Sequence, residues 1–270
     1  MRTEILNALQ QLEQQHNIRI LLASETGSRA WGFPSPDSDY DVRFIYCHPL
    51  EWYLGIDEKK DTIEQMVGEL DLVGWDLRKS LRLMRKSNAA MFERLQSPVV
   101  YLEQSGFREE LLALAPEYFS CRAGLHHYLS MAFRYRQICQ EQEAVKLKDL
   151  FYLLRTSLAS LWIVERGYIP PMAFQQLLPL ILDRELQAKL LALVALKAQV
   201  NEKYMHPRDP QLESYVQEVM GYCETRAAAM QKREGSSEAL NQLFSKITAA
   251  DAAAAGAVTA KAKEPICKSL

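Results

Sequence analysis

A glycine–serine turn followed by alternating aspartates constrains this chain more than any other feature. Residues 18–24, IRILLAS, are too short for most helices and rich in branched apolar side chains, so they predict a buried strand. Gly27 and Ser28 come next, in a loop over residues 25–38 that is dense in Gly, Ser, Pro and Asp. A second strand is predicted over 40–46. The polar loop therefore connects two strands of one α/β unit.

The second strand opens with Asp39-Tyr40-Asp41. Alternation along a strand places Asp39 and Asp41 on the same face, where two carboxylates repel each other and are costly to ionise together. Bound Mg²⁺ removes that cost, and carboxylate oxygens are its preferred ligands. Backbone N–H groups at Gly27 and Ser28 can face an anion, because glycine has no Cβ to block a close approach. An enzyme that holds a nucleoside triphosphate (NTP) with its magnesium ions needs both features.

A third carboxylate is expected on a neighbouring strand. Residues 69–75, ELDLVGW, alternate like a strand, and Asp71 is flanked there by apolar side chains. A buried charge without a partner is costly, so Asp71 is poorly placed for a purely structural role. Asp76 is the alternative, but its position just before a helix gives it a structural explanation as an N-cap. We therefore expect Asp71 to complete the site.

Hydrophobic periodicity divides the chain into three parts. Up to residue 105 it predicts helices over 4–15, 77–87 and 89–95 around the strands, with one weaker strand over 60–67. After residue 105 only helical patterns remain, and an all-helical domain is expected over 106–235. Residues 236–270 are predicted to form a flexible tail with a loose helix near 238–247. The helices expected in the second domain cover 106–115, 121–142, 145–166, 171–182, 184–198 and 210–232.

Composition argues against several classes of protein. The 32 Lys and Arg residues nearly balance the 34 Asp and Glu residues, and the net charge of −2 provides no global field that steers the chain onto nucleic acid. The five cysteines form no CxxC pair, which argues against a disulfide framework and a cysteine zinc site. The first residues lack the apolar core of a signal peptide, and no apolar run reaches 18 residues. A cytoplasmic protein without a membrane segment is expected.

The motif resembles the signature of the DNA polymerase β-like nucleotidyltransferase superfamily. Gly27-Ser28 is followed by ten intervening residues, Asp39-x-Asp41 and a later strand aspartate. The strings GSRAWGFPSPDSDYDVRFIY and DLVGWDLRKSL are most similar to a branch of bacterial and phage predicted nucleotidyltransferases, some of them associated with RNA repair. The resemblance covers about residues 1–235. It implies an α+β fold: a polymerase-β-type palm, with a small mixed sheet and helices over residues 1–105, followed by an all-α helical bundle.

The resemblance also implies a reaction and its residues. A nucleoside monophosphate would move from an NTP, with ATP as the default, to a hydroxyl on an RNA end, a protein or a small molecule, and pyrophosphate would be released. Asp39, Asp41 and Asp71 would bind two Mg²⁺ ions, with Mn²⁺ as an alternative, and Asp71 would help to activate the attacking hydroxyl. Ser28 and the Gly27 backbone would hold the terminal phosphates. The alternative is a non-catalytic nucleotide-binding or toxin–antitoxin-type regulatory module on the same fold, against which the three aspartates argue.

The predicted helical domain offers three further candidates for nucleotide binding. Lys148, Tyr152 and Arg155 fall at i, i+4 and i+7 and therefore share one helix face. In related nucleotidyltransferases a helical second domain closes the cleft and supplies basic and tyrosine side chains to the triphosphate. The alternative is a solvated face with one tyrosine over the core.

The loop around the motif leaves two further alternatives open. Arg29 and Arg43 either balance the charge of the aspartates or contact the nucleotide, and Arg29 is placed with the candidate nucleotide-binding residues. Trp31 and Phe33 favour packing within the loop over a platform for base stacking.

Overall fold

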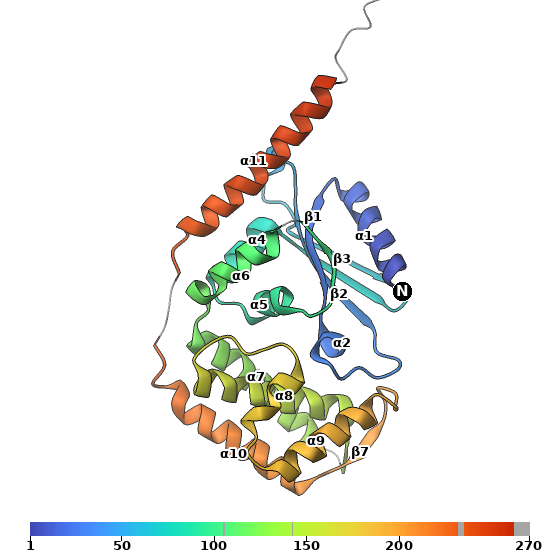
Figure 1. Ribbon diagram of the computed structural model, residues 1–270, viewed down its shortest axis with the longest axis vertical. Helices are drawn as coiled ribbons and strands as arrows, with labels where there is room; N and C mark the ends of the chain where they lie inside the picture. Colours follow the sequence, from blue (N-terminus) through green and yellow to red (C-terminus); the bar gives the residue numbers. More distant parts are fainter. Residues whose placement is uncertain (105, 142, 232–234, 262–270) are drawn as a thin grey trace, which may run out of the picture.

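The structure is a computed structural model, which describes residues 1–104, 106–141, 143–231 and 235–261. Five strands form one mixed sheet in the order β3-β4-β2-β1-β5 (Figure 1). Strand β2 pairs antiparallel with β1 and parallel with β4, while β3 and β5 lie at the two edges. The strands are β1 (Arg19–Glu25), β2 (Tyr40–Cys47), β3 (Thr62–Val67), β4 (Leu70–Asp76) and β5 (Val100–Glu103).

Helices cover both faces of the sheet. On one face, α1 (Arg2–His16) buries Ile5, Leu9 and Leu12 against the β2 side chains of Val42 and Phe44. The opposite face is covered by α4 (Leu77–Arg85), α5 (Ala89–Gln96) and α6 (Phe107–Tyr118). Because side chains alternate along a strand, the β2 residues between those under α1 project towards the second face. This alternation places the candidate site on the α4–α6 side of the sheet.

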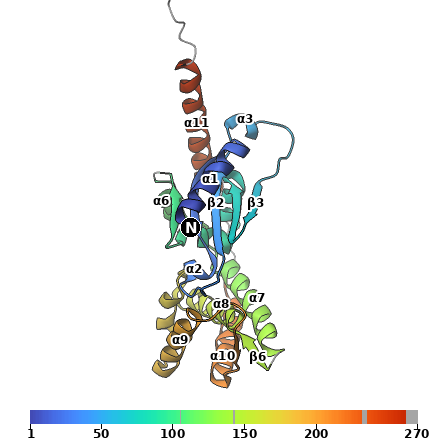
Figure 2. The same ribbon diagram turned by 90° about the vertical axis from the view of Figure 1, so that its right-hand side faces the viewer.

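The helical part, which follows α6 and runs to residue 231, lies below the sheet in Figure 1. Its main helices are α7 (Cys121–Gln140), α8 (Leu147–Arg166), α9 (Arg184–Lys197) and α10 (Pro210–Ala227). A short helix, α2 (Gly27–Trp31), lies between the sheet and these helices (Figure 2). Trp31 and Phe33 are buried there, and Phe33 stacks on Phe151 of α8 with ring centroids 4.7 Å apart. The loop after β1 is therefore built into the core of the helical part. Trp31 and Phe33 have a packing role, as predicted, but their partners lie in α8 as well as within the loop.

The division of the chain at residue 105 stays a prediction. One apolar cluster runs from Phe92 of α5 through Leu125 of α7 and Ile163 of α8 to Val219 of α10. The sheet and the helical part therefore share buried surface, and their helices are packed together in this structure. This shared apolar core holds α8 in a fixed position relative to β2.

Short-range contacts fix several helix ends, and they confirm the N-cap predicted at Asp76. Asp76, Asp183 and Asp209 each accept hydrogen bonds from backbone N–H groups in the first turn of α4, α9 and α10. Gly167 ends α8 in the left-handed conformation, with φ of 71°. These residues act within a few positions of themselves in the sequence, which is why a single sequence reveals them.

Several expected elements are corrected. Residues 171–182 do not form one helix but two single 3₁₀ turns, η1 (Phe174–Gln176) and η2 (Leu178–Leu180), because Pro179 has no N–H to continue a helix. The helical part also contains a small antiparallel ribbon of β6 (Ala144–Lys146) and β7 (Met205–Pro207). The predicted loop 25–38 contains α2, and the four-residue strand β5 and the short helix α3 (Leu50–Tyr53) had no prediction.

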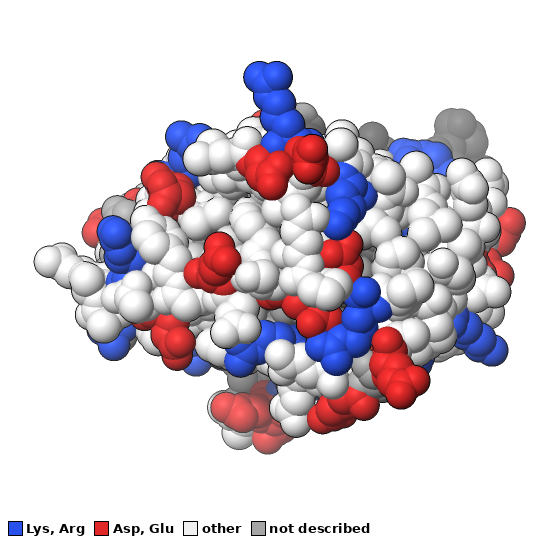
Figure 3. Space-filling view, turned by 90° about the horizontal axis from the view of Figure 1, so that it is seen from below, with Lys and Arg blue, Asp and Glu red and all other residues white. Residues whose placement is uncertain are grey.

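The last described helix, α11 (Glu238–Lys261), is longer than the helix expected over 238–247. Residues 262–270 of the predicted tail lie outside the described residues. Within the described chain, no helix is both long enough and apolar enough to cross a membrane. On the face seen from below in Figure 1, acidic and basic side chains are interspersed (Figure 3), in line with the near balance of charges in the sequence.

Candidate active site

Asp41 and Asp71 lie side by side at the start of two parallel strands. The register pairs Asp41 of β2 with Asp71 of β4. One nitrogen of Arg43, Nη2, donates to Asp41 Oδ1 at 3.0 Å and to Asp71 Oδ2 at 2.7 Å. Its other terminal nitrogen donates to the Asp71 carbonyl oxygen at 2.8 Å. Arg43 therefore holds the two carboxylates at a fixed separation, which is the charge-balancing role that the sequence left open for it.

The turn after β1 is pressed against Asp41. The backbone N–H and the hydroxyl of Thr26 both donate to the Asp41 carbonyl oxygen, at 2.8 and 3.0 Å. Gly27 adopts φ of +63°, and a Cβ at this position would lie 2.1 Å from Asp41 Oδ2. Only glycine fits here without displacing the carboxylate, so the turn and the aspartate form one packed unit.

The carboxylate of Glu25, at the end of β1, contacts the backbone of Asp41. Glu25 is fully buried, and it accepts hydrogen bonds from the Asp41 N–H at 2.7 Å and from the Tyr101 hydroxyl. Burial raises the pKa of Asp41, and the neighbouring charges of Asp71 and Asp39 raise it further against the opposing effect of Arg43. A bound cation would offset the cost of keeping the buried Asp41 carboxylate charged beside Asp71 and Asp39.

Asp39 immediately precedes β2 and is exposed. Its carbonyl oxygen accepts a hydrogen bond from Arg29 Nε at 3.1 Å, and the Ser38 carbonyl oxygen accepts one from Arg29 Nη2 at 2.6 Å. The Arg29 guanidinium also lies 3.8 Å from the centroid of the Tyr40 ring. Arg29 thus braces the loop that carries Asp39, a contact that differs from the nucleotide contact expected for it.

Asp76 is the N-cap that the sequence predicted. Its Oδ1 accepts from the Arg78 N–H at 2.8 Å, and its Oδ2 accepts from the Tyr53 hydroxyl at 2.6 Å. The side chain is 0% exposed. Asp71, in contrast, is partly exposed beside Asp41, so the structure separates the two carboxylates into a capping group and a neighbour of the candidate site.

These positions predict opposite phenotypes for the two aspartates. Asp76→Ala should lower the free energy of unfolding by about 2–4 kcal/mol, because it removes an N-cap and leaves the buried Tyr53 hydroxyl without its acceptor. Asp71→Asn should change it by less than about 1 kcal/mol, since its ion pair is partly exposed, but it should remove the nucleotidyl transfer that the sequence motif predicts. Urea titrations and transfer rates measure both effects. The reverse pattern would exclude Asp71 as the third carboxylate.

Lys148 and Tyr152 of α8 lie near the Asp41 carboxylate. Burial lowers the pKa of Lys148, but the Glu202 carboxylate and the charges of Asp41 and Asp39 outweigh it and raise the pKa overall. Burial raises the pKa of Tyr152, and the nearby charges of Asp41 and Glu202 add to that effect. Both side chains are therefore within electrostatic reach of Asp41, on the side of α8 that faces the sheet.

Arg155 shares their helix face but has a different position. It is 2% exposed, its Nη2 donates to Glu93 Oε1 of α5 at 2.9 Å, and its guanidinium lies 4.3 Å from the Trp31 ring centroid. The same Glu93 oxygen accepts from the Tyr128 hydroxyl at 2.9 Å. This burial does not fit the predicted contact of Arg155 with phosphates. Arg155 instead joins α5, α2 and α8.

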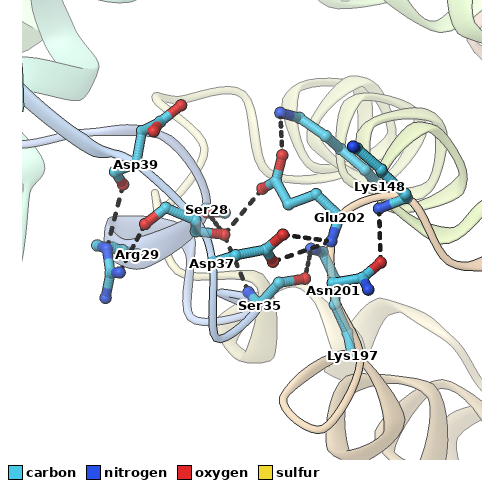
Figure 4. A network of polar contacts seen from close by, with 11 residues as sticks. Ser28, Arg29, Ser35, Asp37, Asp39, Lys148, Lys197, Asn201 and Glu202 are labelled. Atoms are coloured by element: carbon cyan, nitrogen blue, oxygen red, sulfur yellow. Dashed lines mark hydrogen bonds and ion pairs between the residues drawn. The ribbon is translucent and has the colours of Figure 1, made fainter. Parts of the chain in front are cut away.

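A polar network joins the motif loop to the helical part (Figure 4). Ser28 Oγ donates to Ser38 Oγ at 3.1 Å, and Ser38 Oγ donates to Glu202 Oε1 at 2.8 Å. Lys148 Nζ donates to the other oxygen of Glu202 at 2.5 Å. Lys197 Nζ donates to Ser35 Oγ at 2.8 Å. Ser38 and the Glu202 carboxylate thus connect the Gly27–Ser28 turn to Lys148.

Sequence reasoning missed Glu25, Ser38, Lys197 and Glu202. Two of them had a local signal: Glu25 ends a run of buried apolar residues, and Lys197 continues the apolar face of α9 formed by Leu186, Leu190 and Leu193. Glu202 had none, because its partner Ser38 is 164 positions away along the chain.

The donor set fits a divalent cation of the Mg²⁺ type. Asp39, Asp41 and Asp71 offer hard carboxylate oxygens. The pKa of Asp41 is raised chiefly by burial, and the charges of Asp71 and Asp39 add to that effect. In the described part of the chain, no three His, Cys, Asp or Glu side chains are already arranged as a metal cluster. Arg43 instead bridges two of the three aspartates, so a cation would have to share their oxygens with this guanidinium.

Comparison with known proteins gives a family match, two relatives in sequence and a solved structure. Residues 1–246 match the RNA repair pathway DNA polymerase beta family. The chain is 39% identical over 247 residues to the uncharacterized protein YcgL of Bacillus subtilis, which covers 90% of this chain and 95% of that protein. It is 29% identical over 147 residues to the uncharacterized protein MJ0002 of Methanocaldococcus jannaschii, covering 53% of this chain and 59% of that one. A solved nucleotidyltransferase-like protein from Exiguobacterium sibiricum aligns at 12% identity and a TM-score of 0.31, over 83% of this chain and 74% of that chain.

Proposed function

The chain belongs to the RNA repair pathway DNA polymerase beta family, and from this premise we propose that it is a metal-dependent nucleotidyltransferase. It moves a nucleoside monophosphate from an NTP to a hydroxyl acceptor. The acceptor oxygen forms a bond to the α-phosphorus, the bond from that phosphorus to the β-phosphate oxygen breaks, and pyrophosphate leaves. The observation that carries the proposal is the pairing of Asp41 with Asp71 across β2 and β4, with Gly27 packed against the Asp41 carboxylate.

Asp39, Asp41 and Asp71 would hold Mg²⁺, or Mn²⁺ in its place. When bound, the cation supplies positive charge for the triphosphate and makes the acceptor hydroxyl more acidic. The residues of the chain prepare this site. Arg43 fixes the separation of Asp41 and Asp71, Glu25 holds the Asp41 backbone, and Asp71 receives the acceptor proton. The Gly27–Ser28 turn, Lys148 and Tyr152 face the phosphates.

ATP is the default nucleotide, and an RNA end is the acceptor that the name of the family favours. Incubation of the protein with each α-labelled NTP, Mg²⁺ and separate pools of RNA, protein and small molecules tests both assignments. Label should enter one pool, and a chelator that removes Mg²⁺ should abolish this incorporation. If no pool takes label from any NTP while the NTP still binds, the chain is a non-catalytic nucleotide-binding module on this fold.

Lys148→Ala should weaken NTP binding by about 10- to 100-fold, the effect of losing a hydrogen bond to a charged group. Binding of the free acceptor should hardly change, because the Lys148 ammonium faces the Ser28–Ser38 side of the site. Isothermal titration with ATP and with the acceptor measures the two affinities. Lys189→Ala is the matched control, since it removes a similarly exposed lysine that pairs with Asp209 at 2.7 Å. Equal ATP affinity in the wild type and Lys148→Ala would remove Lys148 from the nucleotide site.

A further inference from the structure

The carboxylate of Glu202 lies among the polar groups that the proposed function assigns to the triphosphate (Figure 4). One oxygen accepts from Lys148 Nζ at 2.5 Å, and the other accepts from Ser38 Oγ at 2.8 Å. Ser38 in turn accepts from Ser28 of the Gly–Ser turn. The Glu202 carboxylate therefore already occupies the hydrogen-bond donors of Lys148 and Ser38 beside the motif.

A second lysine, Lys197, belongs to the same polar network (Figure 4). Lys197 is only 1% exposed, and its Nζ donates to Ser35 Oγ at 2.8 Å. Burial lowers the pKa of Lys197, and the nearby carboxylates of Glu202 and Asp37 oppose this shift. A buried ammonium needs compensating negative charge. Two lysines and two carboxylates thus balance each other in this network.

The two carboxylates are held differently. Asp37 accepts from the Glu202 backbone N–H at 2.9 Å, which anchors the main chain of residue 202 to the motif loop. The Glu202 side chain is 20% exposed, so it lies at the edge of the network. Rotation about its side-chain bonds can carry the Glu202 carboxylate into solvent while its backbone stays in place.

Resting on the proposed function, we propose that Ser38 and Lys148 form the subsite for the terminal phosphate of the NTP, that the buried Lys197 adds positive charge to it, and that Glu202 fills this subsite as an internal anion until the nucleotide displaces it. A terminal phosphate carries about two negative charges and offers three acceptor oxygens. It can therefore replace the Glu202 carboxylate on Lys148 and Ser38 and keep Lys197 neutralised. Asp37 still accepts the hydrogen bond from the Glu202 backbone N–H when the side chain has moved away.

An internal anion reduces the apparent affinity for the nucleotide. Only molecules with Glu202 swung out can bind, and the apparent Kd rises in inverse proportion to that fraction. Glu202→Gln keeps the shape of the side chain but removes its charge, which leaves Lys148 and Lys197 to attract the phosphate. We expect Glu202→Gln to bind ATP about tenfold more tightly. A purely structural Glu202 predicts unchanged or weaker binding instead.

The experiment compares three probes by isothermal titration: ATP, inorganic tripolyphosphate and AMP, each with Mg²⁺. Glu202→Gln should tighten ATP and tripolyphosphate by about tenfold and leave AMP unchanged, because AMP has no terminal phosphate. Glu213→Gln is the matched control, since it removes a carboxylate that pairs with Arg208 at 2.6 Å in the same helical part. The control should leave all three affinities at the wild-type value.

Two further variants keep the test decisive. If Glu202→Gln fails to fold, Glu202→Asp retains the charge but shortens the side chain, and it should also tighten ATP binding. Adding Ser38→Ala to Glu202→Gln should reverse part of the gain, because Ser38 becomes a donor to the phosphate.

The possible outcomes separate this inference from the proposed function. If wild-type protein binds ATP and Glu202→Gln binds it no more tightly, the subsite assignment is wrong while the transferase proposal stands. If neither protein binds ATP or tripolyphosphate, both are wrong. If Glu202→Gln binds tripolyphosphate more tightly but no NTP is a substrate, the phosphate subsite is supported and the transferase proposal is wrong.

Discussion

Asp41→Asn should abolish nucleotidyl transfer, with a loss of about a thousandfold or more in rate. Asp41 is the carboxylate on which Arg43, the Gly27 turn and the neighbour Asp71 converge. An amide cannot neutralise a cation, and the loss of several kcal/mol of charge stabilisation corresponds to about three powers of ten in rate. The measurement is the rate of label transfer at saturating NTP and Mg²⁺.

The same variant should keep its fold. The pKa of Asp41 is raised by burial and by the nearby acidic groups, so the folded state disfavours the charged form relative to the unfolded chain. The charge therefore opposes folding at pH values above the ordinary pKa, and a neutral amide removes that penalty. The melting temperature should stay close to the wild-type value.

Asp61→Asn provides the control for Asp41→Asn. It removes a carboxylate that pairs with Lys79 at 2.7 Å, just before β3 at the other end of the β3–β4 pair from Asp71, and it should leave transfer intact. Near-normal transfer by Asp41→Asn with any NTP would contradict the metal assignment and leave the aspartate with a structural role alone.

The positions of several candidate site residues could be predicted from local sequence signals, whereas their roles stay predictions. The Gly–Ser turn, the alternating aspartates and the preference for Asp71 over Asp76 all depend on residues within one strand or at one helix end. The structure pairs Asp71 with Asp41 and caps α4 with Asp76. Such features need only backbone geometry, which the sequence pattern specifies.

Features that depend on distant contacts could not be predicted in this way. Helical spacing placed Arg155 on the same face as Lys148, but spacing does not say which partner each side chain meets. Arg155 meets Glu93, 62 positions away, whereas Lys148 meets Glu202. The four residues of β5 carry too little pattern to be recognised, and only their pairing with β1 makes them a strand.

Gly27→Ala should remove most of the transfer activity while the protein still folds. The added Cβ would lie 2.1 Å from Asp41 Oδ2, a separation that forces the carboxylate to move. Arg43 holds that carboxylate from the other side, so the movement also disturbs its bridge to Asp71. A displacement of about 1 Å at a catalytic group costs about a hundredfold in rate.

Gly167→Ala separates this displacement from backbone strain. Gly27 and Gly167 have φ of +63° and +71°, so alanine should lower the free energy of unfolding by about 1–2 kcal/mol through strain at either position. A Cβ at Gly167 would meet no atom within 4 Å, whereas a Cβ at Gly27 would meet the Asp41 carboxylate. Transfer rates measured beside urea titrations should therefore show similar stability losses and an activity loss for Gly27→Ala alone. If both variants keep comparable activity, contact between the turn and Asp41 does not set the geometry of the reaction.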